Sequence, residues 1–245
     1  PGYLALLPLA PRVLSQWPQA VRRAAWALAA LGLMAGLGYY AAVSSPAVRE
    51  RAAASKWYPS NFAGWTELAH EVETMRARMP ADTRIVADNF KIGAELGFAL
   101  DDPRIAVLDH PLNHHHGRAP QLRLWRLHDD GRVARNDAPR LLVVGATDVS
   151  YREQLQRYHD LCEMIGPLPP PSVLNIDRGR QRFLLFALSS DRAEGDWLAP
   201  AMAWIDTPSA GDRVARRFVL QGWAFKDGAG LSRVDFRIAW VGWIL

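Results

Sequence analysis

Three apolar segments of the sequence, each typical of a buried strand, end in side chains that accept, donate or transfer protons. Asp88 and Asn89 follow the first segment, Asp109 and His110 follow the second, and Asp148 follows the third. If the strands are parallel neighbours, these groups should converge on the rim where open α/β sheets bind ligands. Carboxylates and an imidazole on one rim would suit a self-contained enzyme that uses acid–base chemistry. Helix capping is the alternative for Asp88, Asn89 and Asp148.

A run of three histidines, His114 to His116, is the stretch that suggests zinc. Adjacent residues of an extended loop point to opposite sides, so at most two of the three reach one ion, with Asp109 or His110 as further ligands. The sequence has no HExxH motif, and its single cysteine, Cys162, allows neither an intrachain disulfide nor a CxxC site. We therefore expect no metal and no resident cofactor, and we interpret the run as a polar loop at a substrate or an interface.

Two common signatures of catalysis are missing from the sequence. Gly93 and Gly97 lie inside a helical pattern and lack the GxGxxG spacing of a phosphate loop. No GxSxG nucleophile elbow occurs either. No catalytic residue is therefore assigned from motifs.

The elements that would position the polar groups alternate between strands and helices over residues 57–190. Apolar spacings of three and four residues predict helices at 64–79, 91–100 and 151–165, and compact apolar runs predict strands at 85–87, 105–108, 141–144 and 183–188, the last paired with 172–176. Residues 110–125 are predicted to be a loop and residues 128–140 a polar linker. The order of elements predicts an α/β domain over residues 57–190 with a mixed or parallel sheet.

Ahead of this domain lies an apolar segment long enough to cross a membrane. Ala24 to Val43 contains 20 residues without a charge, and about 20 helical residues span the hydrocarbon core. Gly32 and Gly36 are four residues apart, which favours close packing with other membrane helices. We expect a membrane segment over residues 1–48, made of the tail of an earlier helix, a hinge and a transmembrane helix at 24–43. A single-pass anchor and an uncleaved signal segment are the alternatives.

The charges give limited information about orientation and partners. Three basic residues precede the apolar segment and three follow it, at positions 12, 22, 23, 49, 51 and 56. The tighter placement of Arg22 and Arg23 favours a cytoplasmic hinge and an extracytoplasmic remainder. The net charge of +4 is spread among interleaved acids, which argues against a nucleic-acid partner.

The sequence changes character after residue 200, where short apolar runs are broken by glycines and show no helical period. A string of residues here resembles the opening of a bacterial immunoglobulin-like module: Trp204, Ile205, Asp206, Pro208, Gly211, Val219, Gly222, Trp223, Ala224, Asp227 and Gly230. Such a module closes two sheets with about 100 residues. Residues 200–245 are therefore expected to form a short all-β segment, part of a β-sandwich.

A second string resembles the C-terminal extracytoplasmic domain of bacterial membrane glycosyltransferases of the GT-C class. It comprises Ala87, Asp88, Asn89, Ala94, Glu95, Leu96 and Phe98, then Asp109, His110, Pro111, Leu112, Asn113, Gly117, Arg118, Gln121 and Trp125. The similarity is to the dolichyl-phosphate-mannose protein mannosyltransferase and aminoarabinose transferase families, and the opening Pro1 to Ala5 resembles the start of one of their last membrane helices. It covers residues 1 to about 190.

This resemblance implies transfer of a sugar from a polyprenyl-phosphate donor to a lipid, glycan or protein acceptor at the outer face of the bacterial inner membrane, with the α/β part in the periplasm. It places the catalytic acid or base on an upstream loop, so none of the residues here is catalytic. The expected substrate-binding residues are Asp88, Asn89, Asn113, Arg118, Gln121 and Trp125. Arg118 suits phosphate, the amides suit sugar hydroxyls and Trp125 offers an apolar face. A membrane-tethered, non-catalytic module for glycan binding or assembly is the alternative.

Overall fold

The computed structural model describes residues 9–54, 58–131, 138–150, 153–188, 202–208, 214–226 and 231–235. It divides into two units, Pro1–Arg49 and Glu50–Leu245, and each is described by itself. The expected tail of an earlier membrane helix falls mostly on residues 1–8, outside the described residues.

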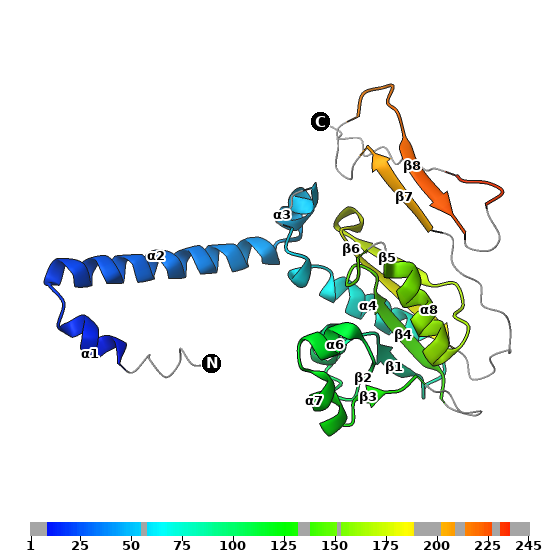
Figure 1. The fold of residues 1–245 in the computed structure, drawn as a ribbon, viewed down its shortest axis with the longest axis horizontal. Coiled ribbons are helices and arrows are strands. Elements are labelled where there is room, and N and C mark those ends of the chain that lie inside the picture. The colour runs from blue at the N-terminus through cyan, green and yellow to red at the C-terminus, as the bar shows by residue number, and fades with distance from the viewer. Residues whose placement is uncertain are drawn as a thin grey trace. The chain divides into compact units, whose positions relative to one another are not determined.

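The first unit consists of helices. Helix α1 (Ala10–Ser15) and the long helix α2 (Gln19–Ser44) are joined by a short turn, and α3 (Pro46–Arg51) follows α2 after Ser45 (Figure 1). Of the described helices, only α2 is long and apolar enough to cross a membrane. Val43 is its only buried residue, and the carbonyl of Val43 accepts a hydrogen bond of 2.9 Å from Nη1 of Arg49. The helix predicted at 24–43 is confirmed as a helix and begins five residues earlier.

The second unit contains a six-stranded mixed sheet, which confirms the expected α/β architecture (Figure 1). Its elements are the helices α4 (Trp65–Arg76), α5 (Phe90–Ala99), α6 (Pro111–His115), α7 (Ala119–Leu124) and α8 (Gln154–Ile165) and the strands β1 (Arg84–Ala87), β2 (Ala106–Leu108), β3 (His128–Asp129), β4 (Arg140–Gly145), β5 (Ser172–Ile176) and β6 (Gln181–Leu188), with single 3-10 turns at Ala52–Ala54, Ser60–Phe62 and Asp177–Gly179.

The strand order is β3-β2-β1-β4-β6-β5. The first four strands of this order are parallel, whereas β6 pairs antiparallel with both β4 and β5. Strand β1 therefore has β2 on one side and β4 on the other, and the chain passes from β1 to β2 through α5. This arrangement confirms the predicted strand, helix, strand unit.

Two apolar clusters cover the two faces of the sheet. Successive side chains of a strand point to opposite faces, so Ile85 and Ala87 pack in the cluster with α4 and α5, and Val86 packs in the cluster with α8. Every residue of β4 is buried. The sheet is thus the middle layer of three, and β4 lies at its centre.

The region predicted as a loop at residues 110–125 is the main difference in the α/β part. It contains the short helices α6 and α7. The side chain of His110 caps α6, because Nδ1 accepts a hydrogen bond of 3.0 Å from the backbone N–H of Leu112. Prolines occupy the first turn of both helices, where no hydrogen bond is lost. The linker predicted at 128–140 begins with β3 and ends where β4 starts.

The β-rich end of the chain contains an antiparallel pair, β7 (Met202–Thr207) and β8 (Gln221–Phe225), with an irregularity between Ile205 and Thr207. Of the short apolar runs expected to be strands in this part of the sequence, residues 223–225 lie in β8, whereas residues 218–220 are not part of a strand. Gly211, Asp227 and Gly230 of the immunoglobulin-like string, and most of the run at 234–238, lie outside the described residues. The partial sandwich remains an expectation.

Candidate functional site

The carboxyl ends of β1, β2 and β4 bring the predicted rim residues together. Asn89 donates a hydrogen bond of 2.9 Å from Nδ2 to Oδ2 of Asp148. Nε2 of His110 lies 3.7 Å from Oδ2 of Asp88. After β1, the chain adds β2 and β3 on one side of β1 and then β4 on the other side. The crevice beyond the carboxyl end of β1 is therefore a topological switch point, the place where open α/β sheets bind ligands. The rim predicted from the sequence is therefore present for Asp88, Asn89, His110 and Asp148, whereas the side chain of Asp109 faces solvent.

Asp88 is buried at the centre of this rim and paired with Arg157 of α8. Nε and Nη2 of Arg157 both donate to Oδ1 of Asp88, the first at 3.0 Å, and Nη2 also donates to the carbonyl of Asp109 at 3.0 Å. Burial raises the pKa of Asp88 to about 6, against the attraction of Arg157. Oδ2 of Asp88 and Nε2 of His110 have no hydrogen-bond partner among the described residues.

His110 is buried beside this pair and is neutral. Burial lowers its pKa to about 4, and the nearby positive charge of Arg157 acts in the same direction. Its Nδ1 is already used as the cap of α6. The ring therefore stays uncharged at neutral pH and ties the start of α6 to the rim.

The side chain of Asp148 has two partners, Lys91 in the first turn of α5 and Asn89, the N-cap of α5. Its Oδ1 forms an ion pair with Nζ of Lys91, and its Oδ2 accepts the hydrogen bond from Asn89. Oδ1 of Asn89 also caps α5, accepting hydrogen bonds from the backbone N–H groups of Lys91 at 3.0 Å and Ile92 at 3.2 Å. Helix capping, the alternative considered for Asn89, is confirmed. Asp148 acts instead as the partner of the cap.

The histidine run and Asp109 form a separate, solvent-facing group. Nε2 of His114 lies 2.7 Å from Oδ1 of Asp109. Burial favours a higher pKa for Asp109, but the hydrogen bond and charge of His114 outweigh it and lower the pKa. The rings of His115 and His116 contact each other, and His116 packs against Phe90. In the part of the chain that the structure describes, no three His, Cys, Asp or Glu side chains are grouped to hold a metal ion.

The side chain of Asn113 connects α6 to the start of α5 and to the end of β2 through hydrogen bonds with backbone groups. Its Oδ1 accepts a hydrogen bond of 2.9 Å from the N–H of Phe90, and its Nδ2 donates one of 2.9 Å to the carbonyl of Leu108. The side chain is buried, and it is not among the residues that line the pocket between α5 and α7. Its amide therefore fixes α6 against α5 and β2.

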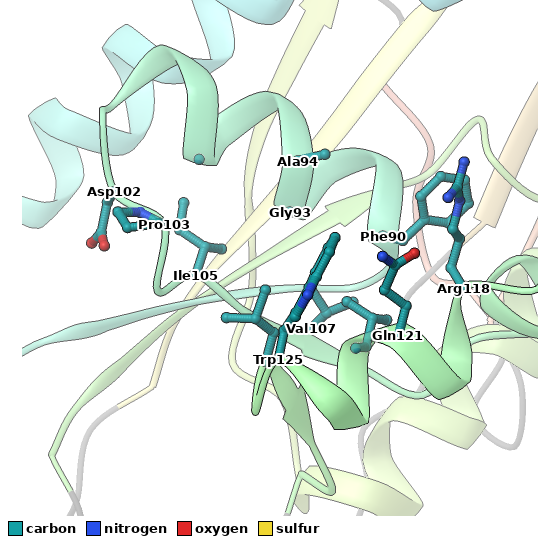
Figure 2. A pocket seen from close by; sticks show the side chains of 13 residues that line it. Phe90, Gly93, Ala94, Asp102, Pro103, Ile105, Val107, Arg118, Gln121 and Trp125 are labelled. Carbon is teal, nitrogen blue, oxygen red and sulfur yellow. The ribbon is translucent and has the colours of Figure 1, made fainter.

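The other three expected substrate residues, Arg118, Gln121 and Trp125, line one pocket of about 440 Å³ between α5 and α7. Figure 2 shows Arg118 and Phe90 at one end, Asp102 and Pro103 at the other, and Trp125 between them. The volume is within the range of small-molecule sites. The six expected residues thus fall into two groups, with Asp88, Asn89 and Asn113 at the strand ends and the other three in the pocket.

Arg157 and Lys91 are the residues that the sequence reasoning missed. Arg157 lies 69 positions from Asp88 and was not part of the predicted apolar face of its helix. A signal was present, because Arg157 precedes the buried Leu161 by four residues and so shares its side of the helix.

Comparisons of the chain with models of protein families, with curated proteins and with solved structures found no match.

Proposed function

We propose that this chain is the C-terminal portion of a membrane glycosyltransferase that moves a sugar from a polyprenyl-phosphate donor to a lipid, glycan or protein acceptor. In this proposal α2 is a transmembrane helix of the bacterial inner membrane, and the α/β part lies in the periplasm. The catalytic acid or base belongs to an upstream extracytoplasmic loop. The α/β part binds substrate.

The single observation that supports this proposal is the pocket between α5 and α7. Arg118, Gln121 and Trp125 belong to the glycosyltransferase-like string of the sequence, and all three line it. A guanidinium suits a phosphate, an amide suits sugar hydroxyls, and an indole suits an apolar or sugar face. The three kinds of group needed to hold a lipid-linked sugar therefore occur together.

The pairing of the rim carboxylates supports a binding role over a catalytic one. Asp88 is engaged by Arg157, and Asp148 by Lys91 and Asn89. A general base must reach the proton that it removes, and both of these groups already accept hydrogen bonds in buried positions. The alternative, a membrane-tethered module for glycan binding or assembly, draws on the same observation.

Transfer of a labelled sugar from a polyprenyl-phosphate donor would test the proposal in membranes that contain the full-length gene product. We expect transfer to depend on the protein and to fall about tenfold or more in Arg118→Gln, because hydrogen bonds to charged groups contribute about 1.5–3 kcal/mol. Arg123→Gln is the matched control, since Arg123 is an exposed arginine of α7 that does not line the pocket.

The same assay distinguishes the glycosyltransferase from the non-catalytic module. The chain of residues 1–245 alone should bind donor but transfer no sugar. Turnover by this chain alone would contradict the upstream placement of the catalytic group. Glycan binding without any transfer by the full-length protein would replace the proposal with the non-catalytic module.

A further inference from the structure

The interior of the pocket between α5 and α7 is mainly apolar. Gly93, Ala94 and Gly97 line it from α5. A Cβ on Gly93 would lie 2.6 Å from Cγ2 of Val107, so glycine lets α5 pack directly against β2. Phe90 and Gly97 are seven residues apart, which at 1.5 Å per residue makes the lining face about 10 Å long. The space therefore suits an apolar group of about this length.

The two ends of the pocket differ in charge (Figure 2). At one end, the guanidinium carbon of Arg118 lies 5.9 Å from the centre of the Phe90 ring, and Arg118 makes no ion pair with any residue that the structure describes. At the other end, Asp102 accepts a hydrogen bond of 3.0 Å from the N–H of Arg104. An anionic group therefore belongs at the Arg118 end, where Gln121 adds uncharged donors.

Large apolar side chains are exposed beside this space. Trp125 lines the pocket and is 59% exposed, and its neighbour Leu124 is 79% exposed. Phe98, which follows the lining residue Gly97, is 89% exposed. An exposed aromatic side chain in the wall of an apolar pocket is typical of a surface that binds an apolar partner. A hydrocarbon chain in the pocket would contact the indole of Trp125.

We infer that the pocket binds a lipid phosphate, with the phosphate on Arg118 and Gln121 and the first part of the hydrocarbon chain along Gly93, Ala94 and Gly97. The choice of phosphate as the anion rests on the proposed function, whereas the apolar interior and the charged end do not. The pocket thus holds the lipid end of the donor, and the sugar extends outward from the phosphate.

Binding of geranyl phosphate to the full chain in nanodiscs tests this inference by calorimetry. Leucine at position 94 would fill the pocket from an exposed helical position, so Ala94→Leu should weaken binding about tenfold or more. Arg118→Gln should weaken it to a similar extent. The controls are Ala99→Leu and Arg123→Gln, which place the same changes on the same helices outside the pocket and should bind as the unchanged chain does. Leucine is a good helix former in both alanine variants.

Three results would overturn the inference. Unchanged binding by Ala94→Leu would place the ligand elsewhere. Binding of geraniol with the same affinity would remove the role of the phosphate. Binding of inorganic phosphate with the same affinity as geranyl phosphate would leave an anion site without a chain. The proposed function fails separately. If geranyl phosphate binds as expected but the full-length protein transfers no sugar, the lipid phosphate site stands and the glycosyltransferase proposal fails. If the full-length protein transfers sugar and Ala94→Leu does not reduce the transfer, the glycosyltransferase proposal stands and the site fails.

Discussion

Replacing His110 with asparagine is expected to make the α/β part less stable as the pH rises from about 4 to about 6. The substitution removes the imidazole and keeps a side chain that can cap α6. Asp88 is then the dominant titrating group of the buried cluster. Its pKa is raised from 3.8 to about 6 in the folded chain, so the folded state holds a proton that the unfolded state releases. The stabilisation is complete below pH 3.8 and is lost as the pH rises through 6.

The unchanged chain should show little of this dependence, because His110 titrates in the opposite sense. Its pKa is lowered from 6.5 to about 4, so the unfolded state binds a proton that the folded state excludes, and stability rises with pH over this range. Between pH 4 and 6 folding in effect transfers one proton from His110 to Asp88. At 1.36 kcal/mol per pH unit, each contribution amounts to about 3 kcal/mol, and the two nearly cancel.

The matched variant is Asp88→Asn, which leaves His110 to titrate. Its stability should rise by about 3 kcal/mol between pH 4 and 6.5, opposite in sign to His110→Asn. The difference in the free energy of unfolding between the variants also includes the cost of leaving Arg157 without its charged partner. The comparison therefore uses the change of this free energy with pH and not its absolute value.

Urea unfolding followed by tryptophan fluorescence, at several pH values and constant detergent, measures these slopes for all three proteins. A flat profile for His110→Asn would refute the assignment of a raised pKa to Asp88. Slopes of the same sign in the two variants would refute the opposition between the two groups.

Two further changes test the local structure. Asn89→Ala removes the cap of α5 and the hydrogen bond to Asp148, so we expect a loss of about 1–2 kcal/mol in the free energy of unfolding, and a loss below a few tenths would contradict the capping role. Gly93→Val introduces a Cβ that collides with Val107, and overpacking of this kind should lower the free energy of unfolding by about 1–3 kcal/mol in the same urea assay. The control is Ala99→Val, at the exposed end of the same helix. Equal effects of the two substitutions would argue against close packing of α5 on β2.

The sheet could be predicted from the sequence wherever a strand was a compact apolar run. The segments 85–87, 105–108 and 141–144 had this pattern, and Asn89 marked the start of the helix between the first two. Helices α6 and α7 were missed because five or six residues are too few to show a helical period. Their prolines were the usable signal.

The site was predictable only in part for a different reason. Strand ends at one edge follow from parallel order, which is why Asp88, His110 and Asp148 were expected to meet. The partner of Asp88 depends on how α8 packs against the opposite face, and one sequence gives no measure of that packing. The pocket likewise depends on the approach of α7 to α5, so Arg118 and Trp125 were expected in a site without any indication that they share a cavity with Gly93.

The central position of β4 has a consequence for the order in which the α/β part is completed during synthesis. Strands β1 and β2, with α5 between them, are translated before Arg140. Until β4 is translated, the other edge of β1 has no strand to pair with, and an unpaired edge can recruit a strand from another chain. The later strands β5 and β6 are close in sequence and pair across a short turn. A ribosome that pauses before residue 140 would therefore expose the partial sheet at the edge that β4 later covers.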